Sequence, residues 1–252
     1  MIQGRQSGTQ VHVPVLPTEV IFYLNIITDG IYLDGTVGLG GHASLILDHL
    51  SPKGHFIGTD LDNEALLLCN KRLSGYPTPV SLFHNSYHNF NATLDELGID
   101  QVNGFLLDLG LSSLQMDSHL RGFSYSTDSD LDMRFDSSQE IKASGILNHL
   151  SVNDLANVIF QYGEERRSRA IAKSIVKMRP LTTVFDLVES IRRSTPPNHR
   201  DRTLARVFQA IRIKVNGELE KLENFLSTFR DRLVIGGRVA IISFHSLEDR
   251  LV

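Results

Sequence analysis

The stretch Ile31-Tyr-Leu-Asp34-Gly-Thr-Val-Gly38-Leu-Gly40-Gly41-His42 decides the fold, because an apolar run that ends in an acid leads into three closely spaced glycines. The apolar residues predict a buried strand over Ile31 to Val37. Glycine adopts positive φ and lets another molecule approach the backbone closely, so these glycines suit a loop that contacts a cofactor. Residues 43–50 keep apolar residues at helical spacing. We therefore expect a unit of strand, glycine loop and helix.

Two later strands are also predicted to end in an acid, His55 to Asp60 and Val102 to Asp108, with a further strand over Val80 to His84. A strand, a helix and a strand over about thirty residues form a βαβ unit, which implies a parallel sheet. Ligands of such sheets bind beyond the carboxyl ends of the strands. The acids Asp34, Asp60 and Asp108 therefore predict one shared crevice. The alternative, that aspartate simply caps the following helices, explains one position more readily than three.

Length and composition favour a globular protein of one large or two modest domains. The chain has 252 residues, of which 41% are hydrophobic and 21% charged. The first ten residues lack the apolar core of a signal peptide, and no later stretch is long enough to span a membrane, so we expect a cytoplasmic protein. The single cysteine, Cys69, lies among leucines, which favours packing over reactivity and excludes an internal disulfide.

The alternation of strands and helices stops after Asp108. Residues 110–138 show no helical or strand period, and a long irregular segment in a compact domain is more often functional than a simple connector. Helices then dominate, and we expect an α/β domain from residues 1–112 and 215–252, interrupted by a mostly helical insertion over 113–214. The expected helices cover residues 151–159, 168–178, 183–192, 202–215 and 218–233.

The last part of the chain returns to the sheet. A turn at Gly236-Gly237 leads into a buried strand over Arg238 to Phe244, and Ser246 is placed to cap a new helix. Because the chain stops as that helix starts, and the last strand would lie at an unprotected sheet edge, we expect further C-terminal sequence in the natural protein.

Charge is distributed unevenly along the chain. The formal net charge is −4, yet residues 164–214 carry 13 Lys and Arg against 5 Asp and Glu. Such a block is a candidate surface for binding phosphates. The alternative is that these side chains form ordinary solvated helix faces.

The order of residues around the glycines argues against a dinucleotide site. A dinucleotide-binding loop has the pattern Gly-x-Gly-x-x-Gly after the strand, whereas here Asp34 precedes the glycines and their spacing differs. The acids at the strand ends resemble instead the pattern of S-adenosylmethionine-dependent methyltransferases. Asp60 can accept hydrogen bonds from both ribose hydroxyls, and carboxylates suit a ligand that carries an ammonium and a sulfonium group.

Seven sequence blocks make the resemblance more specific. They are similar to those of the ribosomal RNA small subunit methyltransferase H family (RsmH, also called MraW), from about His12 to the last residue. The blocks are Asp34-Gly-Thr-Val-Gly-Leu-Gly-Gly-His42, Leu106-Leu-Asp-Leu-Gly-Leu-Ser-Ser113, Arg121-Gly-Phe-Ser, Leu131-Asp-Met-Arg, Tyr162-Gly-Glu-Glu-Arg, Phe208-Gln-Ala-Ile-Arg-Ile and Ser243-Phe-His-Ser-Leu-Glu-Asp-Arg250.

The resemblance implies a Rossmann-like methyltransferase that transfers a methyl group from S-adenosylmethionine to the exocyclic N4 of a cytidine in the decoding region of small-subunit rRNA. Its substrate would be that rRNA or the assembled small ribosomal subunit, and the insertion would face the RNA. The same resemblance implies a cofactor pocket lined by Gly40, Gly41, His42, Asp60, Tyr87, Asp108 and Gln115.

Asp108 is our candidate for a catalytic role, because the site must orient the target amino group and hold the positive charge that develops on it. Two rival functions stay open, a non-catalytic RNA-binding protein that retains the cofactor and a nicotinamide-dependent dehydrogenase. His84 and His88, which flank a strand end, and His245 beside Ser246 give only weak support to a metal or hydrolase site, and we expect no metal.

Overall fold

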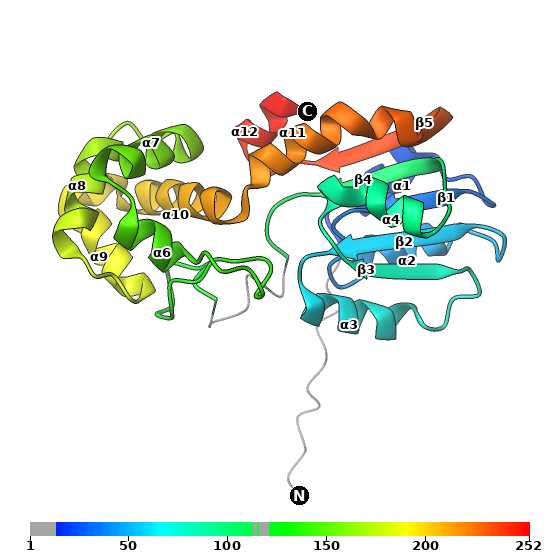
Figure 1. Ribbon diagram of the computed structural model, residues 1–252, viewed down its shortest axis with the longest axis horizontal. Coiled ribbons are helices and arrows are strands. Elements are labelled where there is room, and N and C mark those ends of the chain that lie inside the picture. The colour runs from blue at the N-terminus through cyan, green and yellow to red at the C-terminus, as the bar shows by residue number, and fades with distance from the viewer. Residues whose placement is uncertain (1–13, 113–114, 116–120) are drawn as a thin grey trace, which may run out of the picture.

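A five-stranded parallel sheet forms the core of one lobe of the molecule, as expected of an α/β protein. The computed structural model describes residues 14–112, 115 and 121–252. The strand order is β3-β2-β1-β4-β5, and every neighbouring pair is parallel (Figure 1). The bounds are β1 (Ile31–Asp34), β2 (His55–Asp60), β3 (Val80–His84), β4 (Val102–Asp108) and β5 (Leu233–Ile242).

Helices cover both faces of the sheet because alternate side chains of each strand point to opposite faces. Tyr32 packs in the apolar cluster beneath the helices α1 (Pro17–Leu24), α2 (Gly41–Leu47) and α3 (Asn63–Leu73). The next residue, Leu33, packs on the other face with the helices α4 (Phe90–Glu96) and α11 (Glu218–Thr228). Cys69 is fully buried in the first cluster, which confirms its packing role.

In the part of the chain that the structure describes, five helices form a separate lobe beside the sheet, which we call the helical lobe (Figure 1). They are α6 (Ala143–His149), α7 (Val152–Gly163), α8 (Ser168–Met178), α9 (Val184–Ser194) and α10 (Arg200–Asn216). The lobe has its own apolar core, which extends from Phe123 to Val215. Gly217, with φ of 61°, then turns the chain from α10 into α11 on the sheet. The start of the predicted insertion at 113 lies outside the described residues, and its division from the α/β domain stays a prediction.

Several predicted bounds near the sheet were wrong. The first strand ends at Asp34 rather than Val37, because the chain turns into the glycine loop there. β5 begins at Leu233, and Gly236-Gly237 lies inside it rather than in a turn. The reason is an irregularity in the ladder, in which residues 233–238 of β5 lie opposite only 102–104 of β4, and Gly236 takes φ of 83°.

Helix ends also differ from the predictions, by one or two residues for α9 and α10 and by more elsewhere. α7 continues past Ile159 to Gly163, and α11 ends at Thr228, where a short 3-10 helix, η3 (Phe229–Arg232), follows it. The final helix, α12 (Ser246–Leu251), is capped by His245 rather than Ser246, since the imidazole of His245 accepts the backbone N–H of Glu248. In the described part of the chain, no helix is long and apolar enough to cross a membrane.

The sheet core predicts a large cost for removing one aromatic ring. Phe225 of α11 is fully buried and its ring packs against Phe90, Phe105 and Phe229 at centroid distances of 5.3–5.5 Å. Phe225→Ala should therefore lower the free energy of unfolding by about 3–5 kcal/mol, measured by urea denaturation. Leu67→Ala, a change at a side chain that is 73% exposed, is the control and should stay within about 0.5 kcal/mol of the unmodified protein. Equal losses in the two variants would contradict this packing.

Candidate functional site

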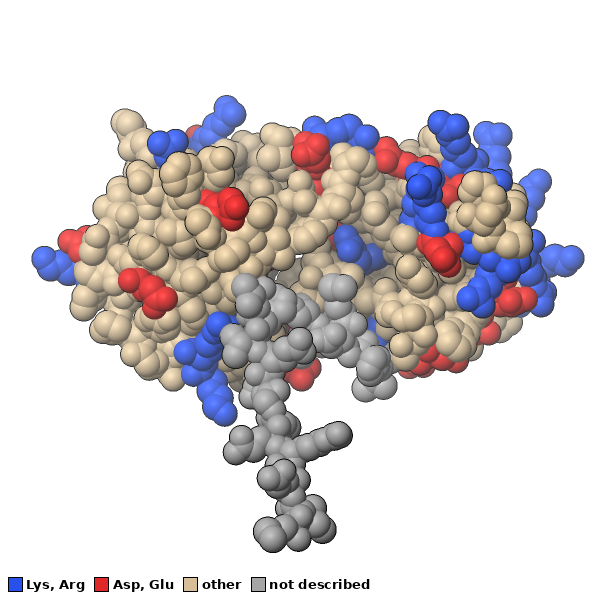
Figure 2. Space-filling view, turned by 180° about the vertical axis from the view of Figure 1, so that it is seen from behind, with Lys and Arg blue, Asp and Glu red and all other residues tan. Residues whose placement is uncertain are grey.

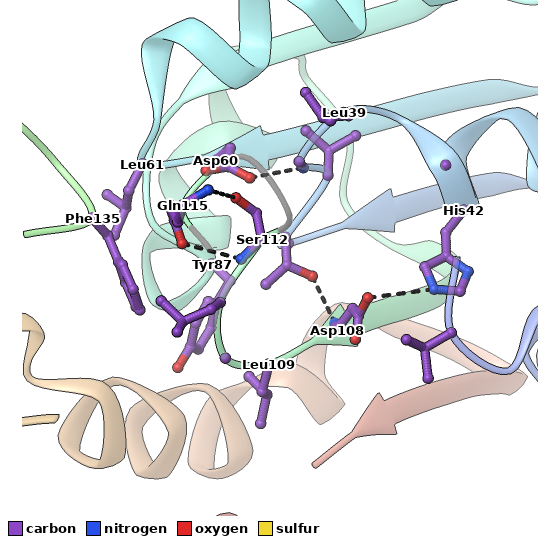
Figure 3. Close-up of a pocket in the computed structure, with 18 of the residues that line it drawn as sticks. Leu39, His42, Asp60, Leu61, Tyr87, Asp108, Leu109, Ser112, Gln115 and Phe135 are labelled. Atoms are coloured by element: carbon purple, nitrogen blue, oxygen red, sulfur yellow. Dashed lines mark hydrogen bonds and ion pairs between the residues drawn. The ribbon is translucent and has the colours of Figure 1, made fainter. Parts of the chain in front are cut away.

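The candidate site lies where the strand order reverses. From β1 the chain proceeds to β2 and β3 on one side, and β4 and β5 lie on the other. The loops that leave β1 and β4 therefore diverge, which opens a crevice at the carboxyl ends of these strands. A pocket occupies this position, and Figure 3 shows 18 of the residues that line it. Of the predicted site residues, its walls include Gly41, His42, Asp60, Tyr87, Asp108 and Gln115.

The glycine loop folds tightly over the end of β2. Gly38 takes φ of 50°, and its backbone N–H donates to Asp60 Oδ2 at 2.8 Å. Gly40 takes φ of 77° at the start of α2 and does not line the pocket; a Cβ there would lie 3.0 Å from Cys69 Sγ. Positive φ and the lack of space explain why glycine is required at this position. Gly40 thus shapes the loop that its neighbours Gly41 and His42 present to the pocket.

Asp60 is held at the end of β2 by backbone donors. Its carboxylate accepts the N–H of Gly38 on one oxygen and the N–H of Asp62 on the other, the latter at 2.9 Å. Burial raises the pKa of Asp60, and these hydrogen bonds partly oppose that rise. Each carboxylate oxygen has a second lone pair, so Asp60 can still accept hydrogen bonds from a ligand.

Asp34 lies beneath the pocket rather than in its wall. It is 1% exposed, and its Oδ1 accepts the backbone N–H of Thr36 at 3.0 Å. The hydroxyl of Thr36 accepts the backbone N–H of Asp108 at 2.6 Å, so this group joins the ends of β1 and β4. Burial raises the pKa of Asp34 to about 7, and the nearby carboxylates of Asp108 and Asp60 add to that rise.

His42 and Asp108 lie beside each other on one side of the pocket (Figure 3). His42 Nε2 lies 3.5 Å from Asp108 Oδ2. Among the described residues, neither ring nitrogen of His42 has a hydrogen-bond partner, nor does Asp108 Oδ1, although all three atoms are buried. Buried polar atoms are nearly always hydrogen-bonded in native proteins. These atoms are therefore suited to a polar ligand.

Tyr87 and Gln115 complete the other side of the pocket. The hydroxyl of Tyr87 donates to the backbone carbonyl of Glu218 at 3.3 Å, and burial raises the pKa of this phenol. Gln115 is 4% exposed, and its side-chain oxygen accepts the N–H of Ser112 at 3.1 Å. The pocket thus gathers residues from both halves of the sheet.

The described part of the irregular segment, residues 110–138, also contacts the pocket. The guanidinium of Arg121 forms an ion pair with Asp62, just after β2, and donates to the carbonyls of Arg134 at 2.7 Å and Phe135 at 2.9 Å. Phe135 lines the pocket. The part of the predicted functional loop that the structure describes therefore reaches the site.

Sequence reasoning missed the residues that follow β5. Phe244 and Glu248 line the pocket together with Glu218. Glu248 is 2% exposed; its Oε2 accepts the N–H of Phe244 at 2.9 Å, and burial raises its pKa. The rule that selected Asp60 and Asp108 could have found this group, because β5 ends at the same edge of the sheet.

One cluster has the composition of a metal site. Ligand atoms of Glu218, His245 and Glu248 all lie within 4.8 Å of one another. Both carboxylate oxygens of Glu218, however, accept hydrogen bonds from Arg212, at 2.9 and 2.8 Å. Since this guanidinium already supplies the positive charge, we assign no metal to the cluster.

The other predicted histidines do not form a site together. His84 Nε2 lies 2.9 Å from the carbonyl of Leu61, whereas His88 Nδ1 lies 2.8 Å from the hydroxyl of Ser86. They therefore contact different partners.

Comparison with known proteins gives consistent results. The sequence profile described as the MraW methylase family matches residues 9–252. A protein of Thermosipho africanus named "Ribosomal RNA small subunit methyltransferase H" is 50% identical over 96% of this chain and 84% of its own length. Proteins of the same name from Kosmotoga olearia and Thermotoga neapolitana are 45% and 47% identical, over 96% and 97% of this chain and 83% of their own lengths.

The buried carboxyl of Asp34 predicts a pH-dependent stability difference. Its pKa of about 7 in the folded protein lies above the value of about 3.9 expected in the unfolded chain. The folded state therefore binds the proton more tightly, and stability is lost as the pH rises from about 4 to about 7. Asp34→Asn does not titrate there, so the unfolding free energy of the unmodified protein should fall relative to that of the variant, by up to about 1.4 kcal/mol per pH unit.

Urea denaturation of both proteins at several pH values between 4 and 8 measures this difference. A difference in unfolding free energy that is the same at every pH reflects packing and does not bear on the pKa of Asp34. Parallel curves across the whole range would show that the carboxyl of Asp34 does not have the raised pKa.

Proposed function

The chain belongs to the MraW methylase family, whose methyl donor is S-adenosylmethionine, and we propose that it methylates the exocyclic N4 of a cytidine in the decoding region of small-subunit rRNA. The relatives at 44–50% identity are named as methyltransferases of small-subunit rRNA. The observation that carries the proposal is the pair of His42 and Asp108 at the reversal of the strand order, with buried polar atoms that lack partners.

The residues present fit the cofactor. We propose that Gly40, Gly41, His42, Asp60, Tyr87, Asp108 and Gln115 form its site, with Gly40 acting through the shape of the loop. Asp60 would accept hydrogen bonds from the ribose hydroxyls through lone pairs that the backbone leaves open. The pocket wall also includes Glu218 and Glu248, so among its charged side chains the carboxyl groups outnumber the guanidinium of Arg72. This charge suits a ligand with an ammonium and a sulfonium group, and it is poorly suited to a pyrophosphate.

When bound, S-adenosylmethionine supplies a methyl group on a positively charged sulfur. The lone pair of cytosine N4 is delocalised into the ring, so the protein must orient the amino group and stabilise positive charge as it forms on that nitrogen. Asp108 is suited to both tasks because its Oδ1 has no partner in the described structure. We propose that Asp108 accepts a hydrogen bond from the amino group, and that His42 holds the carboxylate in place from the other side.

The first test concerns cofactor affinity. Asp60→Ala removes the proposed ribose acceptor, and each lost charge-assisted hydrogen bond should weaken binding about 10- to 100-fold. Isothermal titration with S-adenosylmethionine measures this loss, and Asp100→Ala, at an exposed position just before β4, is the control. If Asp60→Ala folds and binds the cofactor as the unmodified protein does, the proposed ribose contact is wrong. Binding of NADH without binding of S-adenosylmethionine would favour the dehydrogenase.

The second test concerns catalysis. Asp108→Ala and Asp108→Asn should lower the rate of methyl transfer by about 100-fold or more at saturating cofactor, since charge at the reacting nitrogen is no longer stabilised. Transfer of labelled methyl groups is measured with free small-subunit rRNA and with assembled small subunits, which also identifies the substrate. Full activity of Asp108→Ala with normal cofactor affinity would refute the role of Asp108. Cofactor binding without any transfer by the unmodified protein would indicate the non-catalytic alternative.

A further inference from the structure

A second hollow lies between the helical lobe and α12. We call this hollow the arginine groove, because five arginines line it. They are Arg166, Arg167, Arg202, Arg206 and Arg250. The first two come from the connection between α7 and α8, the next two from one face of α10, and the last from α12. Figure 2 shows that Lys and Arg side chains gather on the helical lobe, at the right of that view.

The acids beside the groove neutralise only part of its charge. Glu164 accepts a hydrogen bond from Arg250 at 2.7 Å, and Glu165 Oε2 lies 3.6 Å from Arg206 Nη1. In the described part of the chain, Arg166, Arg167 and Arg202 take part in no ion pair. Their charge is therefore available to an anionic partner.

Arg167 gives an independent indication of a ligand. Its Nη1 is buried, yet it has no hydrogen-bond partner among the described residues. A guanidinium nitrogen can only donate, and phosphate oxygens are acceptors that match its geometry. A solvated helix face, the alternative for this basic block, would instead leave the nitrogen in contact with water.

The groove and the first pocket share a wall. α12 contributes Leu247 and Arg250 to the arginine groove and Glu248 to the pocket that contains Asp108. At the rim of the groove, the ring of Phe160 is 57% exposed. Exposed aromatic rings beside arginines are typical of surfaces that bind single-stranded nucleic acid, where bases stack on the rings.

We propose that the arginine groove binds the phosphodiester backbone of a single-stranded RNA segment that flanks the target cytidine, with a base stacked on Phe160. This inference rests on the proposed function, since the target base would enter the pocket on the other side of α12. A base that is to be modified must leave its stack, which is easiest in single-stranded RNA. Contacts with the flanking backbone would keep that nucleotide at the pocket.

The salt dependence of RNA binding tests the groove. Each phosphate contact to single-stranded RNA contributes about −0.7 to the slope of log K against log salt concentration. Arg166→Ala/Arg202→Ala should therefore weaken binding of a fluorescein-labelled single-stranded oligoribonucleotide and make the slope less steep by about 1.4. Lys177→Ala, an exposed residue at the other end of α8, is the matched control and should change neither quantity. Phe160→Ala should weaken binding at an unchanged slope.

The proposal would be overturned if the Arg166→Ala/Arg202→Ala variant bound the oligoribonucleotide with the same affinity and the same salt dependence as the unmodified protein. Methyl transfer to small subunits separates this outcome from failure of the proposed function. If the unmodified protein transfers methyl groups, the groove variant should show a raised KM for the subunits, and an unchanged KM would refute the groove alone. If the unmodified protein transfers none while the groove variant binds RNA weakly, the groove stands and the enzymatic function fails.

Discussion

The connection between the ends of β1 and β4 is the constraint on which the rest of the structure depends. The Thr36 hydroxyl accepts the N–H of Asp108, and the backbone N–H of Thr36 donates to the buried Asp34, so the carboxyl ends of the two parallel strands are held together. The crevice between their loops then has a rigid floor. The glycine loop, whose turns require Gly38 and Gly40, presents His42 to this crevice. The N–H of Gly38 also holds the carboxylate of Asp60 beside it.

This arrangement explains why the three acids have different environments. Burial raises the pKa of both Asp60 and Asp34, to about 7 for Asp34, and the backbone N–H groups of Gly38 and Asp62 partly oppose the rise at Asp60. Asp108 keeps an oxygen without a partner in the described structure. Each of these acids is the last residue of its strand, so the contacts of each carboxyl group, and not its position along the strand, decide whether it supports the site or faces into it. Aspartate therefore has three different roles: Asp34 supports the site from below, Asp60 is the proposed acceptor for the ligand, and Asp108 is the candidate catalytic group.

Much of this architecture could be predicted from local sequence, because strands such as β2 and helices such as α3 are set by short apolar runs with clear ends. The predictions failed where the structure depends on distant partners. Gly236 resembles a turn residue, yet it lies in β5 because the irregular pairing with β4 accommodates its positive φ. Glu218 was missed as a pocket residue because only the packing of α11 on the sheet brings it to the site. No spacing in the sequence reports that contact.

The position of α12 links the two hollows in a physically specific way. Its Arg250 contacts Glu164 of the helical lobe, and its Glu248 is held on the sheet side by the backbone N–H of Phe244 and by the nearby His245. A shift of this short helix would therefore alter both walls at once. Because buried polar contacts hold one side and an exposed ion pair holds the other, we expect the pocket side to be the firmer of the two. Binding of the RNA backbone in the arginine groove would then act first on the exposed pair of Arg250 and Glu164, while the buried contacts of Glu248 oppose a shift of α12 at the wall beside Asp108.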